Sequence, residues 1–247
     1  MRAISAILVF TFLATCSIAV ETESIGVKDL PPEISVKGKF IEGLKWKDKN
    51  GVNILILSFK GTIDEKTPYG DVRSIFLYGE QYVVNNGSVK LLWDIIDFEK
   101  ACDFSASLTG NGFIENSTTI TDLDQDGITE TLIAYKLVCR GEPWPAQMKI
   151  LIHENNVKYG LRGSMLWLLL EAPYDKLPSP LSKIDFDDFE YDKSKVTEDE
   201  KEWYRKENFE HGLVLGRYRN ENDFQNAPKV FLLHAKKQWR KLMIERL

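Results

Sequence analysis

The sequence predicts a mainly β protein, with antiparallel sheets in a sandwich-like or partial propeller-like arrangement and two carboxyl-terminal α-helices packed on them. Short runs rich in β-branched and aromatic residues recur about every ten residues between positions 33 and 170, and turn signals separate them. From residue 171 to residue 247 the pattern changes to a linker, an acidic segment and two stretches with helical start signals. Because the linker is short, we expect the helices to pack on the same domain.

Alternation of apolar and polar residues places the expected strands. In chain order they cover residues 37–47, 52–59, 74–84, 88–98, 114–120, 131–138, 148–153 and 157–162. The polar stretch 61–71, which contains a proline and two glycines, is expected to be a loop. Turn signals at residues 50–51, 85–87 and 154–156 predict hairpins between the strands that flank them.

Two helices are expected near the carboxyl end. Thr197 and Glu200 form a capping box, so the first helix should start there and continue to about His211. The second should start near Ala227-Pro228, because proline is favoured in the first helical turn. Its broad apolar face lies opposite lysines and arginines. Such a helix either docks on the domain or, if it is exposed, binds a membrane surface.

The stretch that precedes these helices is expected to be irregular. Residues 172–180 contain three prolines and predict a linker or an irregular wrap. Residues 185–192 alternate phenylalanine with charge and lack a turn glycine. We interpret this second segment as a half-buried strand or a surface segment rather than a second metal site.

The amino terminus has the pattern of a secretory signal peptide over residues 1–19. Arg2 supplies a basic start, an apolar stretch follows, and small residues favour cleavage after Ala19. The alternative is a lipoprotein signal with lipid attached to Cys16. Either signal predicts an exported protein, in the periplasm or at the cell surface. A flexible leader is expected over residues 20–32.

The mature chain is expected to be acidic. Cleavage after residue 19 of the 247 leaves 228 residues, and the one charge that is lost is that of Arg2. The 32 basic residues therefore become 31 against 37 acidic ones, which gives a net charge of −6. Nucleic acid is not an expected partner, because its recognition requires a basic face.

Two cysteines remain in the mature chain, Cys102 and Cys139. An even number of cysteines in an exported protein predicts a disulfide between them. The alternative is a pair of free, buried thiols. A metal site built on these two is not expected, because no further cysteine or histidine lies two to four residues from either.

A nine-residue acidic loop carries the one specific piece of metal chemistry in the sequence. Its carboxylates stand at the first, third, fifth and ninth positions: Asp122, Asp124, Asp126 and Glu130. Gly127, at the sixth position, can adopt the positive φ that turns the chain back under an ion. Alternating oxygens in a tight loop are the donors that calcium prefers. The alternative is an acidic turn whose aspartates cap backbone amides.

The pattern D-x-D-x-D-G-x-x-E followed by a strand resembles the calcium loops of FG-GAP and VCBS-type repeats, as in integrin-like propeller blades. The resemblance implies one structural calcium ion, bound by the four carboxylates and by the backbone carbonyl of Ile128. One copy occurs, whereas propellers repeat their blades. A standard EF-hand is excluded, because its twelfth position requires glutamate and Ile133 stands there.

No catalytic motif is found, and we assign no catalytic residue. The three histidines are isolated, and the sequence has no G-x-S-x-G, P-loop or G-x-G-x-x-G. Asp94 and Asp97 could serve glycoside chemistry as a carboxylate pair if both faced one cleft. The alternative is that both are surface residues. An enzyme is therefore less expected than a binding or structural protein.

Residues 121–163 and the carboxyl-terminal FQNAPKVFLLHAKKQWRK resemble a family of exported bacterial proteins of uncharacterised biochemistry. The name of that family links it to surface polysaccharide biosynthesis, so the resemblance implies an envelope location and an envelope glycan as partner. We expect a non-enzymatic cell-envelope protein with a structural calcium loop. The alternatives are a glycan-acting enzyme that uses Asp94 and Asp97, and an interaction module that uses the last helix.

Overall fold

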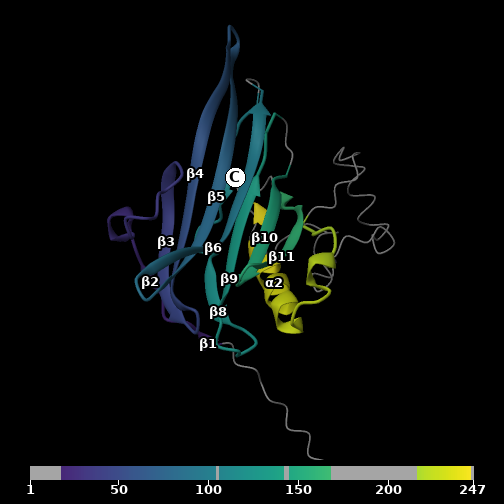
Figure 1. The fold of residues 1–247 in the computed structure, drawn as a ribbon. Helices are drawn as coiled ribbons and strands as arrows, with labels where there is room; N and C mark the ends of the chain where they lie inside the picture. The colour runs from purple at the N-terminus through teal and green to yellow at the C-terminus, as the bar shows by residue number, and fades with distance from the viewer. Residues whose placement is uncertain (1–17, 104–105, 142–144, 168–215, 246–247) are drawn as a thin grey trace, which may run out of the picture.

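The structure of the protein is a computed structural model that describes residues 18–103, 106–141, 145–167 and 216–245. Within these residues the fold consists of two antiparallel sheets and one α-helix, α2 (Lys229–Leu242), as Figure 1 shows. The described part of the chain forms neither a closed propeller nor a closed barrel. The mainly β prediction is therefore confirmed, and its propeller-like variant is not. Three predicted segments lie outside the described residues. They are the linker (172–180), the acidic segment (185–192) and the first helix (197–211).

The first sheet, sheet I, has five strands that are neighbours in the same order as in the chain. They are β2 (Glu23–Ser24), β3 (Lys39–Asp48), β4 (Gly51–Thr67), β5 (Gly70–Asn85) and β6 (Ser88–Cys102). The turn signals at 50–51 and 85–87 lie in the β3–β4 and β5–β6 turns, as the sequence predicts. Asn86 and Gly87 both have positive φ, which is the backbone that a tight hairpin of this kind requires.

The second sheet, sheet II, has the order β1-β8-β9-β10-β11, and β7 also pairs with β9. Its strands are β1 (Ile18–Ala19), β7 (Gly112–Phe113), β8 (Thr119–Asp122), β9 (Glu130–Leu137), β10 (Gln147–Glu154) and β11 (Val157–Ser164). A short parallel pair joins β12 (Leu166–Trp167) to β13 (Ile244–Glu245) at the end of the described chain. The acidic loop connects β8 to β9, so both of its ends are held in sheet II.

The prediction of a loop over residues 61–71 is wrong. These residues continue β4 and β5 as one long hairpin, whose ladder runs out to the pair Thr67 and Gly70. Figure 1 shows this hairpin reaching beyond the rest of sheet I at the top of the view. The side chains near its tip face solvent, with Tyr69 81% exposed. Because neither face of this part is buried, its sequence lacks the apolar alternation from which a strand is predicted.

The two sheets pack face to face, and their inner faces form one hydrophobic core. The buried residues from sheet I are Trp46, Leu55, Leu57, Ile75, Leu77, Trp93 and Ile95, and those from sheet II are Ile120, Ile133, Tyr135, Leu137 and Leu151. Each fully buried aliphatic or aromatic side chain of this kind stabilises the fold by roughly 1.5–3 kcal/mol. The arrangement is that of a sandwich.

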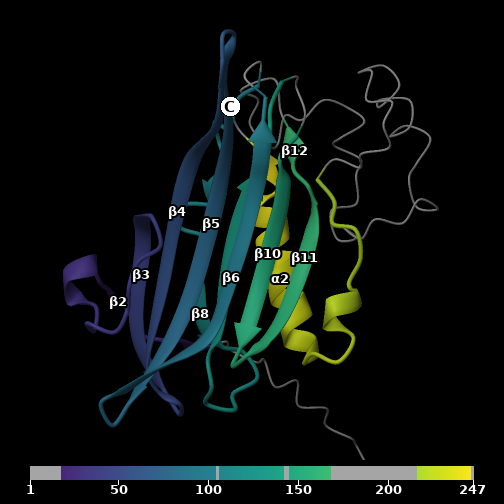
Figure 2. The same cartoon turned by 45° about the horizontal axis from the view of Figure 1, so that its top comes forward.

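The helix α2 covers the outer face of sheet II, as Figure 2 shows with the helix behind β10 and β11. It starts directly after Pro228, so the start predicted from the sequence is confirmed. Phe231, Ala235 and Trp239 form its buried face, and Leu233 on another side is 65% exposed. The apolar face that the sequence predicts is therefore used for docking on the domain. No helix in the described part of the chain is long and apolar enough to span a membrane.

The residues predicted to form a flexible leader, 20–32, lie against sheet I. They contain β2, which pairs with β3, and the 3₁₀ helix η1 (Val27–Asp29). Ile25 is 7% exposed and packs with Ile54 and Ile56 on the face of sheet I that points away from sheet II. The few apolar residues of this stretch follow no sustained period, so the sequence alone does not predict this contact.

Candidate functional site

The acidic loop turns tightly between the end of β8 and the start of β9. Gly127 has a φ of 87° and Gln125 a φ of 64°, so two of its residues adopt the left-handed conformation. A Cβ on residue 127 would also meet the end of the Lys49 side chain, which is flexible and can move away. Glycine is therefore favoured at this position for its backbone angle.

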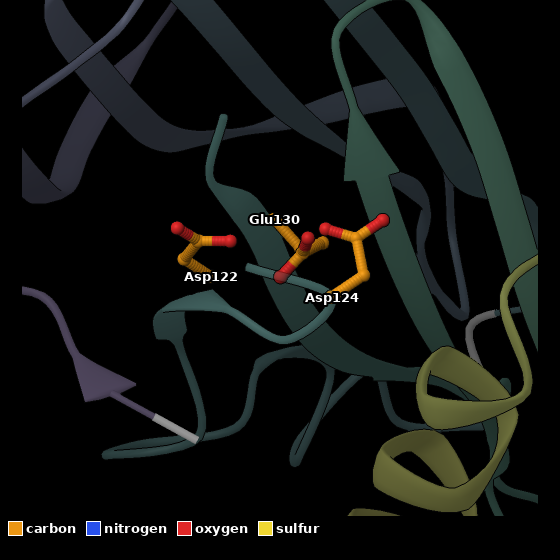
Figure 3. Close-up of side chains that lie close together, drawn as sticks. All are labelled: Asp122, Asp124 and Glu130. Carbon is orange, nitrogen blue, oxygen red and sulfur yellow. The ribbon is translucent and has the colours of Figure 1, made fainter. Parts of the chain in front are cut away.

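Three of the predicted ligands come together at the loop. One carboxylate oxygen from each of Asp122, Asp124 and Glu130 lies within 4.8 Å of the other two. Figure 3 shows the three side chains side by side, with Glu130 between the two aspartates. Such a group of oxygens could hold a metal ion.

Glu130 is the most informative member of the group, because its residue is only 1% exposed. Its Oε2 accepts hydrogen bonds from the backbone N–H of Leu123 at 2.8 Å and from the Thr121 hydroxyl at 3.3 Å. Its buried Oε1 has no hydrogen-bond partner, and the same is true of Asp122 Oδ1. Burial, together with the charge of Asp124, raises the pKa of Glu130 to about 8. Buried carboxylate oxygens without partners are rare and point to a missing cation or proton.

The aspartates of the loop also accept backbone hydrogen bonds. Gly127 N–H donates to Asp122 Oδ2 at 3.1 Å, and Ile128 N–H donates to Asp126 Oδ1 at 2.6 Å. Asp126 N–H donates to Asp124 Oδ1 at 3.3 Å. The aspartates therefore do cap backbone amides of their own turn, as the alternative interpretation predicts. These bonds occupy one oxygen of each aspartate and leave the other for a ligand.

A second set of carboxylates adjoins the first. Oxygens of Asp124, Asp126 and Glu154 lie within 4.8 Å of one another, so Asp124 belongs to both sets. Glu154 is the last residue of β10, and the register of β9 and β10 places it directly opposite Glu130. Sequence reasoning missed Glu154, because its position depends on this register rather than on spacing within the loop. The Ile128 carbonyl remains a predicted ligand.

Sheet I holds the loop from the other side, through its β3–β4 turn. Asp48 accepts hydrogen bonds from the N–H and the hydroxyl of Thr129, at 3.2 and 2.8 Å. Lys49 donates its backbone N–H to the Gly127 carbonyl at 3.0 Å and its side-chain amine to the Asp126 carbonyl. Trp46 Nε1 donates to the Thr129 hydroxyl at 2.7 Å. The acidic loop is thus a point of contact between the two sheets.

A disulfide joins Cys102 to Cys139, with their Cα atoms 5.4 Å apart. Cys102 is the last residue of β6 in sheet I, and Cys139 follows the end of β9 in sheet II. The bond therefore crosses between the sheets and encloses the acidic loop in the segment that it closes.

The carboxylates considered for glycoside chemistry do not share a cleft. Asp97 points toward sheet II, where it accepts a hydrogen bond from the Tyr135 hydroxyl at 2.7 Å and forms an ion pair with Lys149. Asp94 is exposed and lies opposite Glu80, whose ion pair with Lys37 is on the other face of sheet I. Residues three apart on a strand point to opposite faces, which is why the pair separates.

His153 is buried in the core rather than placed at a site. Its ring stacks on Trp93 with the centroids 3.9 Å apart, and its residue is 3% exposed. Burial, with the charge of Lys158, lowers the pKa of His153 to about 3, so the ring is neutral at ordinary pH. A neutral histidine between two sheets is a packing residue.

A pocket of about 690 Å³, which we call the polar pocket because most of the residues that line it are polar, includes residues of the β3–β4 and β10–β11 turns. It is lined by Asn50, Val83, Asn85, Ser88, Lys90, Leu92, Asn155 and Asn156. Asn50 donates from its side chain to the Asn155 side-chain oxygen at 2.8 Å, which joins turns of the two sheets. These two asparagines directly follow Lys49 and Glu154, so the pocket and the acidic cluster use the same two turns.

No protein-family model, curated protein or solved structure matches the chain.

Proposed function

We propose that the protein is an exported, non-enzymatic component of the cell envelope in which one structural calcium ion stiffens the contact between the two sheets. The main observation in favour of a calcium ion is that Glu130 is only 1% exposed and its Oε1 has no hydrogen-bond partner. Asp122 and Asp124 stand beside it with oxygens within 4.8 Å. A cation there would balance charge that neither solvent nor the surrounding protein balances.

Calcium is favoured over zinc and copper by the donors. Every side chain in the two clusters is a carboxylate, and hard oxygen donors suit calcium, magnesium or manganese rather than zinc or copper. A loop that offers many oxygens suits calcium, which takes six to eight, better than magnesium, which requires a strict octahedron. A structural role is supported by Thr129 and Glu130, which are buried where the loop passes into β9 and leave little room for a substrate.

The first expected result is a calcium-dependent gain in stability. With free calcium at a hundred times its dissociation constant, the free energy of unfolding should rise by about 2.7 kcal/mol. For a chain of this size the melting temperature should rise by roughly 5–10 °C. The measurement is a thermal melt of the mature protein in EDTA and in millimolar calcium.

Asp124→Ala should remove most of this gain, because Asp124 belongs to both carboxylate sets. The metal-free variant should fold, since Asp124 is exposed and accepts one long backbone hydrogen bond of 3.3 Å. Glu115→Ala is the matched control, because Glu115 is an exposed acid of the neighbouring segment outside both sets. Equal melting temperatures of the unmodified protein in the two buffers would leave the loop as an ordinary acidic turn.

Export is part of the proposal, supported by the signal pattern over residues 1–19 and by the disulfide. Fractionation of cells that produce the protein should place the mature chain outside the cytoplasm. Mass spectrometry would distinguish cleavage after Ala19 from lipid on Cys16. The buried apolar face of α2 supports docking rather than membrane contact by that helix.

The polar pocket supports an envelope glycan as the ligand of the same protein. Four carboxamides, a serine and a lysine offer both donors and acceptors, which suits a hydroxyl-rich molecule. Titration calorimetry with purified surface polysaccharide should show binding that Asn156→Ala weakens and that Asn220→Ala, at an exposed site outside the pocket, leaves unchanged. Equal binding by the two variants would show that the glycan does not bind in this pocket.

A further inference from the structure

We propose that Glu154, on the neighbouring β10–β11 hairpin, is an additional ligand of the cation in the acidic loop. The inference rests on the proposed function, because it concerns the same ion. It goes beyond the loop pattern, since Glu154 lies 24 positions after Glu130 in the sequence and the pattern ends at Glu130. The ion would then join three parts of the sandwich: the loop, the β3–β4 turn that holds it, and the hairpin of sheet II.

The geometry that supports Glu154 begins with the strand register. Glu154 and Glu130 are directly paired residues on β10 and β9, so their side chains leave sheet II on the same face. A carboxylate oxygen of Glu154 lies within 4.8 Å of oxygens of both Asp124 and Asp126. Asp124 in turn lies within the same distance of Asp122 and Glu130. The two sets share Asp124, and the cluster of five carboxylates is linked through this residue.

Two glutamates of this cluster, one on each strand, have a buried oxygen without a hydrogen-bond partner. Glu130, 1% exposed, has no partner for Oε1, and the buried Oε1 of Glu154 also has none. Among the residues that the structure describes, no salt bridge to Glu154 is found. Like charges directly opposite on neighbouring strands destabilise a sheet when both carboxylates are ionised. A cation beside Asp124, which belongs to both sets, would compensate for the two charges.

Ligand number gives a further reason. Calcium takes six to eight oxygens. The loop itself offers four carboxylates and the predicted Ile128 carbonyl, which makes five donor groups if each binds through one oxygen. Glu154 would bring the protein donors to six, so that water has fewer positions to fill. An ion held in this way is more rigid, and it fixes the turn that carries Asn155 and Asn156 of the polar pocket.

The test compares calcium and terbium binding by the mature protein and three variants. Glu154→Gln keeps the shape of the side chain, and its calcium dissociation constant, measured by titration calorimetry, should rise about tenfold or more. Glu115→Gln removes an exposed charge outside the cluster and should leave the constant unchanged. Terbium luminescence lifetimes in H₂O and D₂O count the waters on the ion, and Glu154→Ala should add about one water.

The water count separates ligation from a field effect. If Glu154 acts only through its charge, Glu154→Gln weakens binding but Glu154→Ala leaves the number of bound waters unchanged, which would overturn the proposal. Equal dissociation constants for Glu154→Gln and the unmodified protein would also overturn it, while the proposed function survives. Absence of any binding by the unmodified protein would instead reject both. Melts in EDTA check that each variant folds without metal.

Discussion

Glu245→Gln should lower the free energy of unfolding by about 3–5 kcal/mol, the usual cost of removing one partner from a buried charge cluster. Glu245 is 1% exposed. Its Oε1 accepts hydrogen bonds from Lys136 Nζ at 3.0 Å and from Arg140 Nη2 at 2.8 Å. Its Oε2 accepts one from the Ala146 N–H at 3.0 Å. The substitution would remove the carboxylate that Lys136 and Arg140, both largely buried, share.

The position of Glu245 explains why the effect should reach the whole fold. Lys136 lies on β9, Arg140 follows it, and Ala146 precedes β10, so Glu245 on β13 ties the end of the described chain to the middle of the sequence. The α-helix α2 ends only three residues before Glu245 and covers sheet II. Loss of this anchor should therefore loosen the docking of α2 as well as the local charge cluster.

The stabilisation by Glu245 should depend on pH in a defined direction. Burial acts to raise the pKa of this carboxyl, but the Ala146 N–H, Lys136 and Arg140 outweigh it, and the pKa lies below its usual value of 4.5. A folded-state pKa below the unfolded one means that the contribution is complete above pH 4.5 and is lost as pH falls further. The difference in stability between the unmodified protein and Glu245→Gln should thus shrink as the pH falls below 4.5.

Denaturant unfolding at pH 7 measures the effect, and Glu23→Gln is the matched control. Glu23 also forms an ion pair, with Lys45 at 3.1 Å, but its side chain is 64% exposed. Exposed ion pairs contribute about 0–1 kcal/mol, so the control should change stability little. If the free energy of unfolding falls by the same small amount in both variants, the cluster at Glu245 does not anchor the end of the described chain.

The acidic loop could be predicted from sequence to the extent that its geometry is local. Gly127 and the alternating aspartates act within nine residues, and the structure brings Asp122, Asp124 and Glu130 together as their spacing suggests. Glu154 could not be found in this way, because its place beside the loop depends on the pairing of Ile133 with Leu151 along β9 and β10. Contacts across a sheet become predictable only when the register is known.

The same distinction holds for the fold. The hairpin turns and the start of α2 follow from local preferences of asparagine, glycine and proline, and the structure has them where they are predicted. The arm of β4 and β5 and the contact of Ile25 with sheet I do not follow, because they lack a buried repeating face. The separation of Asp94 from Asp97 was predictable in principle, since it needs only the two-residue period of a strand.

Replacement of Cys102 and Cys139 by alanine should lower the free energy of unfolding by about 3–4 kcal/mol, and the melting temperature by roughly 10 °C. The two cysteines lie 37 positions apart. By the loop-closure model, the crosslink removes conformational entropy from the unfolded chain and so raises its free energy. Alanine suits the test, because Cys102 is 2% exposed in an apolar position and a serine there would bury an extra hydroxyl.

Three measurements on the mature protein connect this loss to the bond itself. Thiol titration of the unreduced, denatured protein should find no free thiol, whereas two reactive thiols would show that the bond does not form. Reduction with dithiothreitol should destabilise the unmodified protein by about the same 3–4 kcal/mol and leave the double variant unchanged. If reduction has no effect on the unmodified protein, the sheets are held by their common core and by the acidic loop.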